Sequence, residues 1–165
     1  MKRALFLGRF QPFHKGHYEV AKKLMKEYDE LIIVLGSAQA SDCKENPFTY
    51  DERNLMIEKC LGKKNYQIIP VDDINDDAKY VSYVEKKVPK FDAVYCGNDN
   101  ARKLFREKGY ETHDLRRIDC ISATEVRKRI LKDANWKELL PKEVVLVIEE
   151  ISGVERIKEL NCGVL

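Results

Sequence analysis

The chain has 165 residues, enough for one domain with a full core, so we expect a single domain over residues 1–165. Its 30 basic and 28 acidic residues leave a net charge of +2, which gives no reason to expect nucleic acid or a membrane surface as a partner. The sequence shows no signal-peptide core or membrane-spanning apolar run, and its five cysteines form no CxxC pair, so we expect a cytoplasmic protein without a disulfide framework.

Short apolar runs alternate with longer amphipathic segments along the chain. The short runs predict strands at residues 2–7, 30–35, 66–71, 91–96 and 110–114. The amphipathic segments predict helices at residues 17–28, 50–61, 78–88, 98–108 and 122–132, and two more between 138 and 160. This alternation is typical of a Rossmann-like α/β fold, a doubly wound parallel five-stranded sheet flanked by helices, with C-terminal helices over roughly 122–160.

Two of the predicted helices begin with a capping pattern. Thr49 is followed three residues later by Glu52, and the helix is expected to stop at Gly62. Ser122 is followed in the same way by Glu125. Both pairs therefore predict a capping box at a helix N-terminus.

A Pro-containing loop after the first strand carries two of the three histidines of the chain. The strand ends at Gly8, Arg9 follows, and His14 and His17 stand three positions apart at the start of the next helix pattern, which we expect to begin at His17. Imidazoles at a helix N-terminus, together with a bidentate arginine, can bind phosphate oxygens. In an open α/β sheet this loop lies at the carboxyl end of a strand, where such sheets bind their ligands.

Metal binding is the other interpretation of these histidines. Zinc needs at least a third ligand, and no cysteine or carboxylate stands near His14 and His17 at ligand spacing, so we favour phosphate. Four carboxylates after the third strand also resemble a metal-binding cluster, but we interpret them as helix caps and pocket-lining groups. They are Asp72, Asp73, Asp76 and Asp77.

The segment that begins at Ser122 is a second candidate phosphate site. The hydroxyls of Ser122 and Thr124 and the first amides of the helix can donate to a phosphate, and Arg127 lies one turn further on the same side. A capped surface helix with a solvated basic face is the alternative reading. Two such helix starts on one sheet predict a ligand with several phosphates, although the sequence has neither GxxxxGK[ST] nor GxGxxG.

Together the two segments resemble the nucleotidyltransferase superfamily that carries HxGH near the N-terminus and SxTxxR near the C-terminus. Here these motifs read His14-Lys15-Gly16-His17 and Ser122-Ala123-Thr124-Glu125-Val126-Arg127. Over nearly the full length the chain is similar to the archaeal type of nicotinamide-mononucleotide (NMN) adenylyltransferase. The further matching segments are GRFQPFH at 8–14, GSAQ at 36–39, NPFT at 46–49 with Glu52-Arg53, YCGN at 95–98 and GVERIK at 153–158.

The resemblance implies that ATP and NMN react to give NAD and pyrophosphate, with a divalent metal, usually Mg²⁺, bound mainly through the ATP phosphates. It also implies a homo-oligomer, commonly a hexamer. In the family the HxGH histidines contact the phosphates and stabilise the transition state, which assigns catalytic roles to His14 and His17, with Arg9 and Arg127 on the phosphates. Further ATP contacts fall on Gly8, Phe10, Gly16, Gly97, Asn98, Ser122 and Thr124.

The acceptor NMN is expected near the segments that follow the second and third strands. The residues assigned to it are Ser37, Gln39, Lys44, Asp73 and Tyr80. Tyr80 stands where the family commonly has a tryptophan, and a tyrosine can still stack on a cationic pyridinium ring. Asp99 and Ala123 also depart from the family pattern. Arg53, on the second helix, could reach a phosphate or form a surface ion pair.

Two other functions remain open at this point. A related transferase with phosphopantetheine or flavin mononucleotide as acceptor would share the ATP motifs, whereas the 36–39 and 46–49 segments favour NMN. A non-catalytic module that senses NAD or ATP would not need the intact histidines and Arg127.

Overall fold

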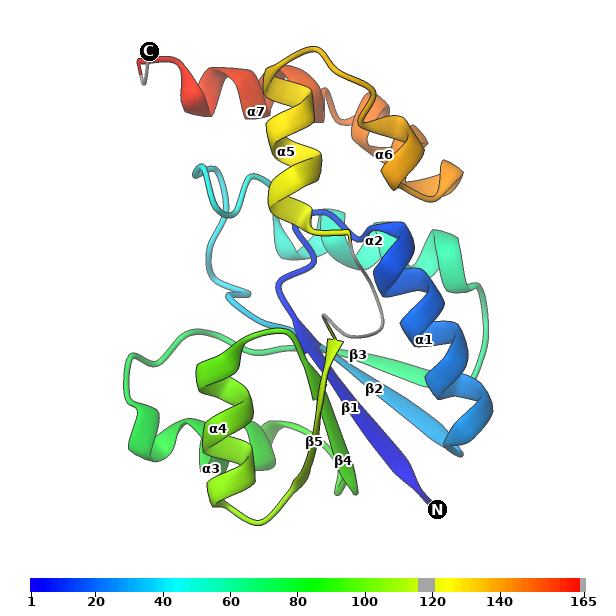
Figure 1. Cartoon of the computed structure of the whole chain (residues 1–165), viewed down its shortest axis with the longest axis vertical. Coiled ribbons are helices and arrows are strands. Elements are labelled where there is room, and N and C mark those ends of the chain that lie inside the picture. The colour runs from blue at the N-terminus through cyan, green and yellow to red at the C-terminus, as the bar shows by residue number, and fades with distance from the viewer. Residues whose placement is uncertain (116–120, 164–165) are drawn as a thin grey trace.

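A computed structural model describes residues 1–115 and 121–163 of the chain (Figure 1). Within these ranges five parallel strands form one sheet in the order β3-β2-β1-β4-β5. The strands are β1 (Arg3–Gly8), β2 (Glu30–Leu35), β3 (Tyr66–Pro70), β4 (Ala93–Cys96) and β5 (Glu111–Asp114). The predicted Rossmann-like parallel sheet is therefore confirmed.

Seven α-helices and a short 3-10 helix are described around this sheet. They are α1 (Lys15–Glu27), α2 (Tyr50–Leu61), α3 (Asp77–Lys87), α4 (Asp99–Glu107), α5 (Ala123–Leu131), η2 (Lys137–Leu139), α6 (Lys142–Glu150) and α7 (Gly153–Asn161). None of the described helices is long and apolar enough to cross a membrane. The four cysteines in the described ranges are free thiols, and Cys120 lies outside them.

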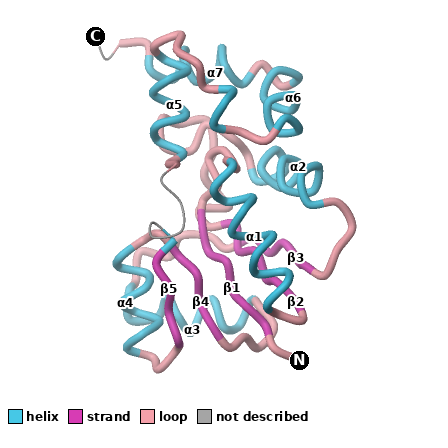
Figure 2. Tube along the Cα trace, turned by 45° about the vertical axis from the view of Figure 1, so that its right-hand side comes forward, coloured by secondary structure: helices cyan, strands magenta, loops and turns pink. Residues whose placement is uncertain are grey.

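The side chains of β1 alternate between two buried clusters. Leu5 and Leu7 pack with Phe105 of α4 and with α3, whereas Phe6 packs with Leu24 of α1 and with α2. Both views show α1 and α2 on one face of the sheet and α3 and α4 on the other (Figures 1 and 2). Because both faces are covered, the central strands are buried and nearly all apolar, as the run at residues 30–35 predicts.

The helices α5, α6 and α7 form a further layer beyond the carboxyl ends of the strands (Figure 2). This layer is joined to the rest by α6, which packs on α2, while Trp136 and Leu140 enter the core that α1 and α2 share. The N-terminus of α5 therefore faces the carboxyl ends of β1 and β4 across the loops that follow those strands.

One predicted helix boundary is wrong. The helix after β1 begins at Lys15 rather than at His17, because His14 is its N-cap and its ring accepts a hydrogen bond from the His17 backbone N–H. Apolar periodicity cannot detect this first turn, since it contains a lysine and a glycine.

Of the two predicted capping boxes, the one at α2 is confirmed and the one at α5 is only half formed. Thr49 and Glu52 form the full capping box, and α2 ends at Gly62 with φ of 63°, as predicted. Ser122 caps α5 by accepting from the Glu125 N–H, but the reciprocal half of that box is missing. The Glu125 carboxylate instead pairs with Nε of Arg129 at 3.1 Å.

Candidate active site

A cavity of about 730 Å³ opens at the carboxyl ends of β1 and β4. The N-terminal turns of α1, α4 and α5 and the loops after β2 and β3 surround it. All of the predicted site residues except two line this cavity. The exceptions are Gln39 and Lys44, which are both exposed.

The loop between β1 and α1 forms the floor of the cavity. Phe10 has a positive φ of 52°, which turns its ring back beneath the chain, and a Cβ on Gly8 would lie 3.0 Å from that ring. A side chain at position 8 would therefore displace the Phe10 ring by a few tenths of an ångström. The ring of Phe10 also lies edge-on to His17, with centroids 4.7 Å apart, and so supports the imidazole from below.

His14 and His17 hold each other through a reciprocal cap. The N–H of His17 donates to Nδ1 of His14 at 3.3 Å, and the N–H of His14 donates to Nδ1 of His17 at 3.3 Å. The two rings stack with centroids 3.5 Å apart and planes inclined by 17°. Because both Nδ1 atoms accept hydrogen bonds, each neutral ring carries its proton on Nε2.

Burial keeps this pair uncharged. It lowers the pKa of His14 from 6.5 to about 4, and burial followed by the charge of His14 lowers the pKa of His17 well below 6.5. At neutral pH the rings therefore act as uncharged hydrogen-bond donors rather than as cations.

Two arginines bring positive charge to the same cavity. Arg9 is exposed at the end of β1. Arg127 is held in place by donating to the Gln11 carbonyl at 2.7 Å and to Oγ1 of Thr124 at 3.5 Å. Burial, and next the charge of Arg9, lower the pKa of Arg127. The two guanidiniums thus repel each other when no ligand is bound, and an anion between them would relieve that repulsion.

The N-terminus of α5 meets the histidines across the cavity. Oγ of Ser122 accepts from the backbone N–H of Glu125 at 3.1 Å, so the hydroxyl proton of Ser122 points away from the cap. Thr124 and the first amides of α5 also line the cavity. The amides and hydroxyls at this helix start, with Arg127 beside them, make a donor-rich anion site.

The wall of the cavity formed by the loops after β2 and β3 is organised by Asp73. Its carboxylate accepts from Oγ of Ser37 at 3.1 Å and from Nε2 of Gln39 at 2.9 Å, and its N–H donates to Gln39 Oε1 at 3.0 Å. Gln39 is therefore one contact away from the cavity. Tyr80 lines the cavity with its ring edge-on to Phe105, and burial raises the pKa of its hydroxyl.

Two of the acidic residues after β3 have defined structural contacts. Asp76 caps α3 by accepting from the Lys79 N–H at 3.2 Å, and Asp73 holds Ser37 and Gln39 as described. In the part of the chain that the structure describes, no group of three His, Cys, Asp or Glu side chains is arranged to hold a metal ion.

The turn after β4 is fixed by a buried arginine. Asn98 caps α4 by accepting from the Ala101 N–H at 2.9 Å. Arg102 donates to the Cys96 carbonyl at 3.1 Å and pairs with Asp114 at 2.9 Å and with Asp99. Asp99 thus supplies a partner for Arg102, and Gly97 and Asn98 line the cavity.

Both interpretations of Arg53 from the sequence, a phosphate contact and a surface ion pair, are wrong. Arg53 neither lines the cavity nor makes a surface ion pair, because its side chain is fully buried and donates to four backbone carbonyls. The acceptors are the carbonyls of Arg9 (2.8 Å), Gly36 (2.9 Å), Ser37 (3.1 Å) and Thr49 (3.2 Å). Arg53 therefore ties the ends of β1 and β2 to the first turn of α2.

Sequence comparison places this geometry in a known family. The profile described as cytidylyltransferase-like matches residues 5–152. The chain belongs to the cytidylyltransferase-like family.

Two curated relatives match nearly the whole of this family member. A nicotinamide-nucleotide adenylyltransferase of Methanococcus aeolicus is 50% identical over 163 residues, covering 96% of this chain and 95% of the relative. Another, from Thermoplasma volcanium, is 44% identical over 164 residues, covering 96% and 92%.

Solved structures show the same fold at low sequence identity. A bifunctional NMN adenylyltransferase/ADP-ribose pyrophosphatase from Francisella tularensis has a TM-score of 0.77 at 19% identity over 96% of this chain. A second structure of that protein, complexed with AMP and a manganese ion, has a TM-score of 0.72 at 20% identity. The chain spans about half the length of these two structures, 52% in each case.

Replacing Arg53 with methionine should destabilise the fold strongly. The substitution removes four side-chain hydrogen bonds to backbone carbonyls from a fully buried position, and we expect a loss of about 3 kcal/mol or more in the free energy of unfolding. Urea denaturation at pH 7 measures this loss. Lys59→Met, on the exposed side of the same helix, is the matched control and should stay within about 0.5 kcal/mol of the parent. Equal losses in the two variants would contradict the role of Arg53.

The buried histidines should also make stability depend on pH. Their pKa values are lowered in the folded state, so the unfolded chain binds more protons between pH 6.5 and about 4. Stability is therefore full above pH 6.5 and falls as the pH drops through this window, by about 3 kcal/mol for His14 alone. Unfolding of the parent and of the double variant His14→Gln/His17→Gln, measured at pH 7 and pH 4.5, tests this. Parallel profiles for the two proteins would disprove it.

Proposed function

We propose that this chain transfers the adenylyl group of ATP to NMN, forming NAD and releasing pyrophosphate. The observation that carries this proposal is the convergence of the neutral His14–His17 pair, Arg9 and the N-terminus of α5 with Arg127 on one cavity. Relatives at 44% and 50% identity bear the name nicotinamide-nucleotide adenylyltransferase, which supports NMN as the acceptor.

The reaction requires the substrates to be positioned and the developing negative charge to be stabilised, and it does not require a strong base. The phosphate oxygen of NMN is already a nucleophile at neutral pH and attacks the α-phosphorus of ATP in line, as the bond from that phosphorus to the bridging oxygen of pyrophosphate breaks. The Nε2–H groups of His14 and His17 donate to the oxygens of the α- and β-phosphates, where negative charge develops. The dipole of α1 behind them adds positive potential.

The leaving pyrophosphate is held from the opposite wall. Arg127 and the helix start at Ser122 and Thr124 bind the β- and γ-phosphates, and Arg9 completes the charge balance. The adenosine lies against Gly97 and Asn98 at the end of β4, with Gly8, Phe10 and Gly16 providing the close backbone approach on the β1 side.

The acceptor is bound between the loops after β2 and β3. The ring of Tyr80 stacks on the cationic pyridinium, and Asp73 and Ser37 line the same cavity. Gln39 acts through Asp73, and Lys44 lies on the exposed loop from which it would approach the acceptor phosphate.

We propose Mg²⁺ as the metal. A structural neighbour is complexed with AMP and a manganese ion, which supports a divalent cation. The donor set here fits an ion that arrives with ATP, because phosphate oxygens and waters are the preferred ligands of Mg²⁺. When bound, the ion would neutralise phosphate charge that Arg9 and Arg127 leave uncompensated.

We further propose that the enzyme works in the cytoplasm as a single-domain subunit of a homo-oligomer, with a hexamer as the specific expectation. Leu131 of α5 and Leu146 of α6 are 40% and 56% exposed, and both are apolar side chains that a subunit contact could cover. The mass in solution, compared with the 19.2 kDa subunit, gives the number of subunits in the oligomer.

The proposed reaction is tested by pyrophosphate release from ATP and Mg²⁺ with a panel of acceptors. The panel contains NMN, nicotinic acid mononucleotide, flavin mononucleotide and phosphopantetheine. We expect release with NMN accompanied by NAD. Release with flavin mononucleotide or phosphopantetheine alone would overturn the acceptor, and ATP binding without release would indicate a sensor.

Within the same assay, His17→Ala should lower kcat by about a hundredfold or more, because it removes a donor to the transition state. Lys15→Ala is the matched control: Lys15 is exposed in the same turn of α1, binds the Glu138 carbonyl at 2.7 Å and does not line the cavity. Circular dichroism checks that both variants are folded. A loss of less than tenfold for His17→Ala would exclude His17 as a transition-state contact.

A further inference from the structure

We infer that Arg156, on the C-terminal helix α7 and outside the cavity, is a positioning residue for ATP. It acts through residues 47–48 on Gln11, and through the Gln11 carbonyl on Arg127. This inference rests on the proposed adenylyl transfer and identifies how the C-terminal layer contributes to it.

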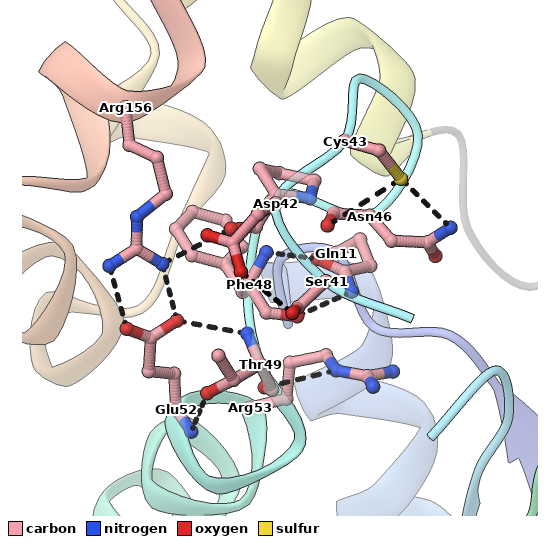
Figure 3. Close-up of polar contacts among 11 residues, drawn as sticks. Gln11, Ser41, Asp42, Cys43, Asn46, Phe48, Thr49, Glu52, Arg53 and Arg156 are labelled. Carbon is pink, nitrogen blue, oxygen red and sulfur yellow. Dashed lines mark hydrogen bonds and ion pairs between the residues drawn. The ribbon is translucent and has the colours of Figure 1, made fainter. Parts of the chain in front are cut away.

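Arg156 makes three hydrogen bonds to the start of α2 (Figure 3). Its two terminal nitrogens bind the two carboxylate oxygens of Glu52 at 2.6 and 2.8 Å, and one of them also donates to the Pro47 carbonyl at 3.1 Å. These residues are more than a hundred positions apart in the sequence. A guanidinium that spans a carboxylate in this way fixes direction as well as distance.

Glu52 couples this ion pair to the cap of α2. The same oxygen, Oε2, accepts from Arg156 and from the Thr49 N–H at 2.9 Å, while the N–H of Glu52 donates to Oγ1 of Thr49 at 3.2 Å. Burial raises the pKa of Glu52, but the hydrogen bonds from Arg156 and Thr49 outweigh it, so the pKa is lowered and the carboxylate is charged at neutral pH. The first turn of α2 is thus held from both sides.

The segment between the cap and the cavity is held twice by α7. The ring of Phe48 is fully buried, and a Cβ on Gly153 of α7 would lie 2.9 Å from it, so the helix packs directly on the ring. Arg156 binds the preceding carbonyl, that of Pro47. Phe48 in turn exchanges two backbone hydrogen bonds, both 2.9 Å long, with the side-chain amide of Gln11.

Gln11 links residues 47–48 to the cavity. It lines the cavity, and its carbonyl accepts the 2.7 Å bond from Arg127. Arg127 is the residue that we assign to the leaving phosphates. A continuous set of contacts therefore joins α7 to the triphosphate site. The contacts that lead from Arg156 toward Asp73 form a longer route, which passes through Glu52, Thr49, Arg53 and Ser37.

The test compares KM for ATP with KM for NMN in Arg156→Ala, Arg156→Lys and Glu52→Gln. We expect Arg156→Ala to raise KM for ATP about tenfold and to lower kcat, because small displacements of positioning groups are amplified in the rate, while KM for NMN stays within about twofold. Arg156→Lys should fall between Arg156→Ala and the parent, since a lysine cannot span the carboxylate. Glu52→Gln should also raise KM for ATP and lower kcat.

Lys158→Ala is the matched control. Lys158 lies on the same helix and forms an ion pair with Asp133 at 2.5 Å that does not lead to Pro47 or Glu52. A purely structural role for Arg156 would leave KM for ATP like that of Lys158→Ala, and that result would overturn the inference, as would an equal rise in both KM values. If Arg156→Ala does not fold, the comparison rests on Arg156→Lys and Glu52→Gln.

Direct titration with a non-hydrolysable ATP analogue separates this inference from the proposed reaction. Weaker binding of the analogue to Arg156→Lys than to Lys158→Ala supports the positioning role even if the parent forms no NAD, in which case the proposed reaction alone fails. Equal binding by both variants overturns the positioning role whatever the parent catalyses.

Discussion

The reciprocal hydrogen bonds between His14 and His17 are the constraint on which the site depends. Each ring uses Nδ1 to cap the backbone of the other residue, so helix formation and imidazole orientation are a single event. Burial keeps the rings neutral. The fold thereby supplies two Nε2–H donors at the end of β1, and each ring is oriented by a backbone N–H of the other residue. The stability of α1 and the orientation of the site histidines therefore depend on the same atoms.

Several buried or half-buried arginines that lie outside the cavity bind backbone carbonyls. Arg53 donates hydrogen bonds to carbonyls that follow β1 and β2, and Arg102 donates to the carbonyl at the end of β4. Arg156 does the same for Pro47. Arg9 and Arg127 are then left to face the cavity. The positive charge is thus divided between arginines that fix the loops and arginines that line the cavity.

The fold and most of the cavity lining are predictable from the sequence because their signals are local. Apolar runs define β1 and β2, Thr49 and Glu52 mark α2, and the HxGH and SxTxxR spacings bring their side chains to one edge of the sheet. The roles of Arg53 and Arg156 are not predictable in this way, since each depends on partners far along the chain whose carbonyls carry no sequence signature. The His14 cap is missed for a related reason: histidine is rarely read as an N-cap.

The tautomer and charge of His14 and His17 can be measured directly by nitrogen-15 NMR of the imidazoles in the free protein. We expect that at pH 7 each ring has an unprotonated Nδ1 and a protonated Nε2, and that His14 takes up a second proton only as the pH approaches about 4. A doubly protonated ring at pH 7, or a proton on either Nδ1, would contradict it.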